Sequence, residues 1–177
     1  MLKLIGVVFL CLCCCGPASW AQSDGQKLPT AVILTLNRRF PGWKFADVSP
    51  EVRKFVKEEL KAASPVLISG DFDGDRRLDY AALIRRGYVF NSQGQAIEPR
   101  HYLVIFLRRN TRYKMYVIKD PGGEYLILAK KGTSDYNYNE QKEITYANDA
   151  ILTGIFEKGG MSYVYKKGKF ISFVSSD

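Results

Sequence analysis

The sequence has little of the chemistry on which thiol and zinc sites depend. Its four cysteines, Cys11, Cys13, Cys14 and Cys15, all lie near the N-terminus, and His101 is the single histidine. If the N-terminal segment is removed, as argued next, no cysteine remains and disulfide or thiolate chemistry is excluded. One histidine without cysteines cannot supply a zinc ligand set. A serine nucleophile also lacks its usual G-x-S-x-G motif, so the histidine is more simply a strand residue.

The sequence also lacks an apolar run long enough to span a bilayer, which takes roughly 20 residues. Its longest run, Leu4 to Cys15, follows Lys3 and is followed by small residues up to Ala21. That order is typical of a secretory signal peptide. We therefore predict a signal peptide at 1–21 and a single mature domain at 22–177, secreted or periplasmic and not transmembrane. The cysteines at the end of the run leave a lipoprotein open as the alternative.

No long run of lysine or arginine is present, although the chain is basic. The formal net charge is +8, and removal of the signal peptide with Lys3 leaves +7. A basic exported protein can approach anionic polymers of the cell envelope, but the excess charge is more simply explained by solubility. We expect no nucleic-acid partner. An envelope polymer or protein stays open as the partner.

Capping residues and hydrophobic spacing predict early helices and then many strands. A helix is expected over residues 31–39, because Thr30 can cap it and the cations Arg38 and Arg39 suit its last turn. A second helix is expected over about 50–62, because Ser49 can cap it and apolar residues recur there at helical spacing. The β-branched residues of the first segment leave a strand open as an alternative. The expected strands are 66–70, 80–84, 101–107, 113–118, 124–129, 150–156, 161–165 and 169–174, and 130–142 is expected to be a polar loop. These elements predict an α+β fold in which N-terminal helices precede an antiparallel β-sheet meander.

The densest chemistry lies in residues 71–79, DFDGDRRLD, between two predicted strands. Four carboxylates this close repel one another unless the loop is solvated or a cation lies among them. Calcium suits the spacing, because it takes six to eight oxygen ligands. The predicted ligands are the side chains of Asp71, Asp73 and Asp75, the backbone carbonyl of Arg77, and Asp79 directly or through water. Leu78 is expected to anchor the loop in the core. A solvated turn without metal is the simpler alternative.

Residues 71–83, DFDGDRRLDYAAL, resemble the calcium loops of FG-GAP and VCBS repeats, which implies a structural calcium ion between two strands. The loop occurs once, so the resemblance does not imply a propeller. Arg76 stands where such loops usually have glycine, and Ala82 stands where an EF-hand has its bidentate acid. A further ligand would then come from water or from Asp135 or Glu140. Both departures favour weak binding, as in extracellular modules.

No catalytic set emerges, so we expect a non-enzymatic exported domain with one structural calcium site, acting as a binding or accessory protein of the cell envelope. The alternative is an envelope hydrolase or enzyme inhibitor. It would act through the Tyr-rich loop of residues 135–140, or through a carboxylate pair. The candidates for that pair are Glu124, Glu143, Asp149 and Glu157.

Overall fold

The computed structural model describes residues 27–87, 89, 90, 93, 96, 97 and 100–175. The predicted signal peptide at 1–21 lies outside these residues and stays a prediction. Two helices are described, α1 (Thr30–Arg39) and α2 (Pro50–Glu58), and neither is long and apolar enough to cross a membrane. The strands are β1 (Lys44–Phe45), β2 (Leu67–Gly70), β3 (Asp79–Arg86), β4 (Val89–Phe90), β5 (Ala96–Ile97), β6 (Arg100–Arg109), β7 (Arg112–Lys119), β8 (Tyr125–Ala129), β9 (Ser134–Asn137), β10 (Lys142–Thr145), β11 (Ala150–Gly154), β12 (Gly160–Lys166) and β13 (Lys169–Ser175).

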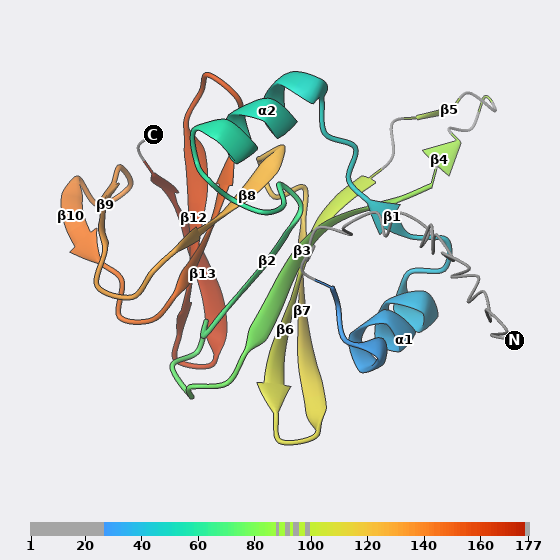
Figure 1. Ribbon diagram of the computed structural model, residues 1–177, viewed down its shortest axis with the longest axis horizontal. Coiled ribbons are helices and arrows are strands. Elements are labelled where there is room, and N and C mark those ends of the chain that lie inside the picture. The colour runs from blue at the N-terminus through green and yellow to red at the C-terminus, as the bar shows by residue number, and fades with distance from the viewer. Residues whose placement is uncertain (1–26, 88, 91–92, 94–95, 98–99, 176–177) are drawn as a thin grey trace, which may run out of the picture.

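The strands form two main antiparallel sheets (Figure 1). The first sheet has the order β1-β3-β6-β7, and β2 pairs with β3 beside β1. The second sheet has the order β10-β9-β13-β12-β11-β8. Strands β4 and β5 pair only with each other among the described elements. Strand β6 is buried on both faces along Tyr102 to Leu107, which confirms the prediction of a central strand there.

The prediction of an α+β protein with N-terminal helices and one meander is wrong, because the described chain is mostly β-structure in two sheets. After β7 the chain leaves the first sheet and starts a second one at β8. There β11 pairs with β8, and β9 pairs with β13, so neighbours in the sheet are not neighbours in sequence. The expected polar loop at 130–142 also contains β9 and the start of β10. Periodicity locates apolar strand faces, but it does not say which strands pair.

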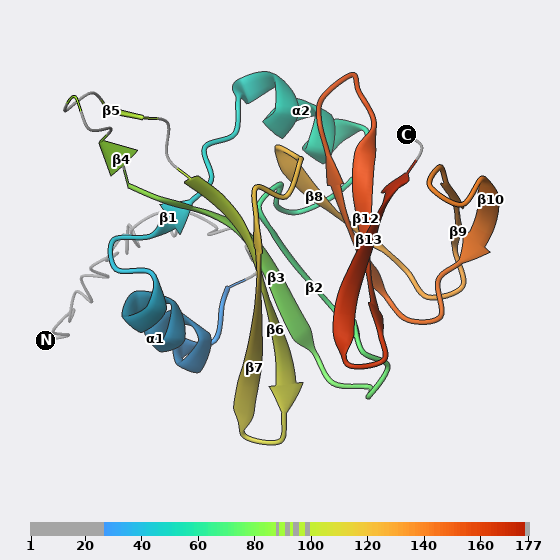
Figure 2. The ribbon, with the colours of Figure 1, turned by 180° about the vertical axis from the view of Figure 1, so that it is seen from behind.

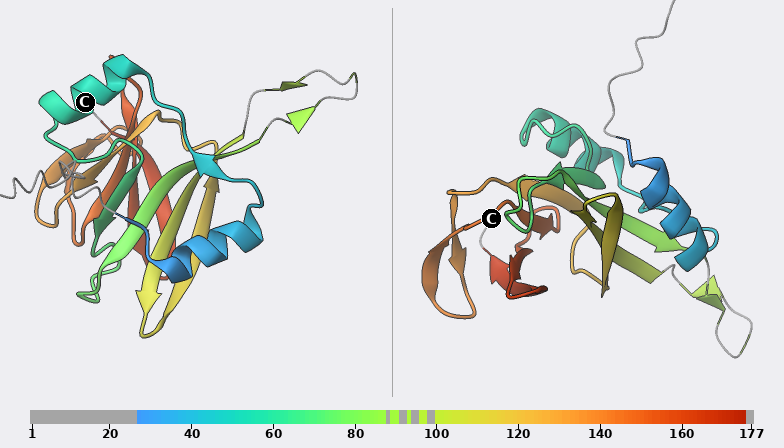
Figure 3. Two further views of the ribbon diagram at one scale, coloured as in Figure 1. Left: turned by 45° about the vertical axis from the view of Figure 1, so that its right-hand side comes forward. Right: turned by 90° about the horizontal axis from the view of Figure 1, so that it is seen from below.

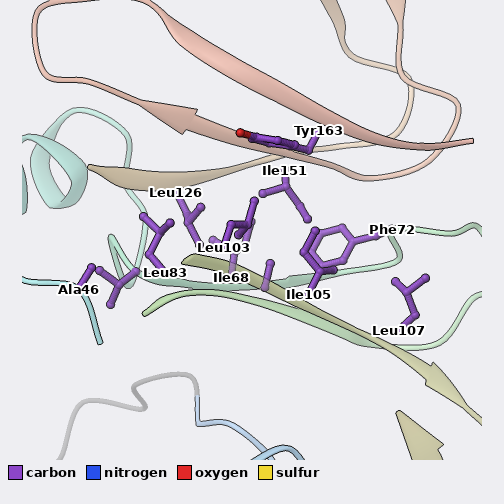
Figure 4. Close-up of a cluster of buried hydrophobic side chains, with 12 residues drawn as sticks. Ala46, Ile68, Phe72, Leu83, Leu103, Ile105, Leu107, Leu126, Ile151 and Tyr163 are labelled. Atoms are coloured by element: carbon purple, nitrogen blue, oxygen red, sulfur yellow. The ribbon is translucent and has the colours of Figure 1, made fainter. Parts of the chain in front are cut away.

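The main core lies between the two sheets (Figure 4). Leu103, Ile105 and Leu107 of β6 face Leu126 of β8 and Ile151 of β11 in this cluster. The alternate residues of β6 face the other way, as the two-residue period of a strand requires. Each of the two sheets therefore contributes one face to a shared core.

Helix α1 covers the outer face of the first sheet, and helix α2 packs against β8 at one edge of the second sheet (Figure 3). The fully buried Val32 and Leu36 of α1 pack on the first sheet, whereas Val52 and Val56 of α2 pack against Tyr125 of β8. Helix α2 begins as predicted: Val52 N–H donates to Ser49 Oγ at 3.3 Å. Helix α1 is also present, but Pro29 takes the capping position and no side chain caps it, so the predicted Thr30 cap is wrong.

Candidate metal centre

The acidic loop connects β2 to β3 and lies where the ends of the two sheets meet (Figures 1 and 2). Gly70 and Asp79 are paired at the base of this hairpin. Phe72 is fully buried in the core between the sheets and holds the loop there (Figure 4). Leu78, which was expected to be the anchor, has 49% of its surface exposed, so that prediction is wrong.

The loop folds around its own carboxylates. Asp71 accepts hydrogen bonds from the backbone N–H of Gly74 at 2.9 Å and of Arg76 at 3.0 Å. Asp73 accepts from Asp75 N–H at 3.2 Å. These short-range bonds are those of Asx-type turns, and they draw the carboxylates toward the inside of the loop.

Two loop residues adopt positive φ. Gly74 has φ +81°, and a Cβ there would lie 2.5 Å from Asn148 Oδ1, so both the backbone angle and the close approach favour glycine. Arg76 has φ 65°, the conformation that glycine adopts readily. An arginine in this conformation costs about 1 kcal/mol or slightly more. Position 76 therefore has the backbone conformation that suits the glycine usual in such loops, whereas the weak binding expected from Arg76 stays a prediction.

The structure brings three of the predicted ligands together. Asp71, Asp73 and Asp79 each offer a carboxylate oxygen, and these three atoms lie within 4.8 Å of one another. Oxygens at such separations can share one divalent cation. Asp75 is not part of this group. The side chain of Arg77 donates from Nη1 to Asn110 Oδ1 at 2.9 Å, and the role of its backbone carbonyl as a ligand stays a prediction.

Arg109, at the end of β6, supplies a positive charge to the loop. Its Nη1 lies 2.5 Å from Asp73 Oδ2 and 3.0 Å from Asp75 Oδ2. Asp73 Oδ2 is buried and accepts no hydrogen bond of good geometry from the described residues, so its contact with Arg109 is an ion pair. Partial burial lowers the pKa of Arg109, but the charge and close contact of Asp73 and the nearby Tyr165 together outweigh burial, so the pKa is raised. The guanidinium therefore acts as an internal cation beside the three carboxylates.

Asp79 is the most deeply buried acid of the loop, with no exposed surface. Its two oxygens accept hydrogen bonds from Phe72 N–H at 3.0 Å and from Arg108 N–H at 2.7 Å. Burial raises the pKa of Asp79 to about 7; the two backbone hydrogen bonds oppose the rise, and the charges of Asp73 and Asp75 add to it. A bound cation would relieve this repulsion and bring the pKa back down.

Asn148 and Asp149, just before β11, clamp the loop from the second sheet, and the sequence analysis did not place them there. Asp71 N–H donates to Asp149 Oδ2 and Asp149 N–H donates to Asp71 O, both at 3.1 Å. Burial raises the pKa of Asp149, but hydrogen bonds from the backbone N–H groups of Lys131 and Asp71 and from Lys130 leave it below its ordinary value. In the sequence, the only signal for this contact with the acidic loop was a polar Asn-Asp pair before a strand.

The two acids suggested as further ligands lie elsewhere. Asp135 Oδ2 accepts hydrogen bonds from Tyr146 at 2.5 Å and from Ser162 at 2.9 Å within the second sheet. Glu140 pairs with Lys142 at 2.6 Å. Within the described residues, neither belongs to the group of three carboxylates close enough to share an ion. Of the sources suggested for a further ligand, water therefore stays the proposed one, beside the predicted backbone carbonyl of Arg77.

Comparisons with known proteins found no match among protein-family models, curated proteins or solved structures. Any functional assignment therefore depends on the chemistry of the residues themselves.

Proposed function

We propose that this protein is an exported, non-enzymatic domain that binds one calcium ion in the acidic loop and serves as a binding or accessory protein of the cell envelope. The observation that carries the proposal is the set of three carboxylate oxygens, from Asp71, Asp73 and Asp79, within 4.8 Å of one another. The resemblance of the loop to FG-GAP and VCBS calcium loops and the predicted signal peptide support the same assignment.

The chemistry of the loop favours calcium over other cations. All its side-chain ligands are hard oxygens, which suit calcium, magnesium or manganese rather than zinc or copper. Calcium tolerates irregular geometry and a variable number of water ligands, whereas magnesium demands a near-ideal octahedron. Since the loop joins β2 and β3 and is clamped by Asp149 from the second sheet, an ion there would be structural.

The first prediction is that calcium raises thermal stability. With an affinity of about 1 mM, typical of extracellular modules, 10 mM calcium should add about 1.4 kcal/mol and raise Tm by about 3–6 °C. Thermal melts in calcium, magnesium or a chelator measure this. Asp73→Asn should abolish the calcium shift, whereas Glu143→Gln, an exposed acid on β10, should keep it. Equal shifts in both variants would mean that calcium acts elsewhere.

The second prediction concerns Arg109, because its guanidinium must give up Asp73 or Asp75 when calcium enters. Arg109→Gln should strengthen calcium binding roughly three- to tenfold, since each partly exposed ion pair is worth up to about 1 kcal/mol. Arg112→Gln is the matched control: it lies opposite Arg109 in the β6–β7 hairpin and removes the same charge. Calorimetric titration should find the control close to the original protein. Weaker binding in Arg109→Gln would show that the arginine helps to build the site.

A second candidate function is favoured by one observation. A pocket of about 320 Å³ lies beside the Tyr-rich segment and includes Asn137 and Glu140 in its wall. An enzyme inhibitor or hydrolase would need such a hollow near residues 135–140. The lining is mostly apolar with a charged rim, which fits binding better than acid–base catalysis.

A further inference from the structure

The outer face of the second sheet carries the pocket of about 320 Å³ that is formed by three parts of the chain. One wall is the β9–β10 hairpin, another is the segment 146–149, and the floor is made by β12 and β13. The hairpin stands beside these strands in Figures 1 and 3. Its volume lies at the lower end of the range for sites that bind small molecules.

The floor of the pocket is apolar and incompletely covered. Phe173 is buried, Ile144 and Val164 are half-buried, and Ile171 keeps 37% of its surface exposed. Val164 and Ile171 are paired across β12 and β13, so their side chains share one face of the sheet. When a ligand covers apolar side chains that are still in contact with water, the burial of their surface favours binding.

The wall of the pocket is held in place by a buried polar cluster. Tyr146 is 3% exposed, and its hydroxyl lies 2.5 Å from Asp135 Oδ2 and 2.9 Å from Ser162 Oγ. Ser162 also donates to Asp135. With these bonds made inside the described chain, the tyrosine ring is fixed before any ligand arrives, which lowers the entropic cost of binding.

The charged groups at the rim of the pocket and just outside it include one more base than acid: Lys130, which lies outside the lining, Lys142 and Lys166 stand against Glu140 and Asp149. Glu140 is paired with Lys142 at 2.6 Å, and Asp149 is paired with Lys130 at 3.2 Å. Lys166 also lines the rim. Within the described part of the chain no carboxylate lies within ion-pair distance of it, although its charge reaches Glu140 and, after that of Lys142, helps to lower the pKa of that acid. A second hollow of about 300 Å³, under α2, has the neighbouring opposite charges Glu157 and Lys158 at its edge and no such surplus.

We propose that the pocket between the β9–β10 hairpin and strands β12–β13 binds a small amphipathic anion, with the apolar body on Val164, Ile171 and Phe173 and the acidic group beside Lys166. This inference gives the ligand class for the binding role proposed above and rests on that role for its biological meaning. Occupancy of the pocket does not require the metal ion.

The probe for this pocket is 8-anilinonaphthalene-1-sulfonate, an apolar ring system with one acidic group, followed by fluorescence titration. N-Phenyl-1-naphthylamine has the same rings without the sulfonate. Lys166→Gln should weaken binding of the sulfonate about two- to fivefold and leave the neutral probe unchanged, as expected for one exposed charge pair. Lys169→Gln is the matched control, because Lys169 is the cross-strand partner of Lys166 and does not line the pocket.

Two further variants locate the bound probe. Val164→Trp should fill the floor and weaken both probes more than tenfold. Ile171→Glu, at an exposed position that tolerates substitution, should repel the sulfonate more than the neutral probe even if Val164→Trp does not fold. Titrations of the probe in calcium and in chelator distinguish failure of one proposal from failure of the other. If the probe binds saturably but calcium does not change the melting temperature, the metal site is contradicted and the pocket is not. Binding that is not saturable at one site, that is equal in the two lysine variants, or that survives Ile171→Glu overturns the pocket assignment.

Discussion

Replacing Asp79 with alanine is expected to destabilise the protein by roughly 2–6 kcal/mol, because one buried and one partly buried backbone donor would lose their acceptors at about 1–3 kcal/mol each. These donors are the N–H groups of Phe72 and Arg108, which belong to the loop and to β6. The loss would therefore separate the acidic loop from the first sheet. Asp79→Asn keeps one acceptor oxygen and should cost less. Urea unfolding of both variants measures the difference, and near-identity with the original protein would contradict the assigned contacts.

The same residue gives a pH dependence with a definite sign. The pKa of Asp79 is about 7 in the folded protein, above the ordinary value of 3.8, so the folded state holds the proton more tightly. Its contribution to stability is full below about pH 4 and is lost as pH rises through about 7. Without calcium, the midpoint temperature of unfolding should decrease as the pH rises from about 5 to 8. Asp79→Asn should reduce this dependence on pH. Calcium should reduce it too, because the cation favours the ionised form.

Phe72→Ala is expected to cost about 3–5 kcal/mol, the range for removing a buried phenylalanine side chain. Phe72 has no exposed surface and packs in the core between the two sheets (Figure 4). The variant should also weaken calcium binding, because the same residue sets the position of Asp71 and Asp73.

Leu78→Ala is the control for that variant. It removes an apolar side chain from the same loop, but Leu78 is half exposed, so its stability should stay within about 0.5 kcal/mol of the original. Thermal and urea melts compare the two. A large loss in Leu78→Ala with little loss in Phe72→Ala would reverse the assigned roles.

Local signals in the sequence proved sufficient for single elements. Ser49-Pro50-Glu51 predicted the start of α2, and the apolar run of β6 predicted a central strand. Both depend on neighbouring residues only, since capping and strand burial are read within one segment. The acidic hairpin between β2 and β3 was predicted for the same reason.

The architecture and half of the site could not be predicted in this way. Pairing of β9 with β13 and of β11 with β8 joins segments far apart in sequence, and an apolar face does not specify its partner. Arg109 and Asp149 lie 34 and 78 residues from the loop groups they contact. In the sequence, an arginine at the end of a strand looks like any solvated charge. Only the folded chain shows that it neutralises Asp73.

A crystal structure of the protein grown or soaked in calcium tests the central claim most directly. The account predicts an ion at about 2.3–2.6 Å from oxygens of Asp71, Asp73 and Asp79, with waters completing its shell. It also predicts that the Arg109 guanidinium moves away from Asp73. If Arg109 still bridges Asp73 and Asp75 at high calcium and no ion lies among the three carboxylates, the loop is a self-neutralised turn and the calcium assignment is wrong.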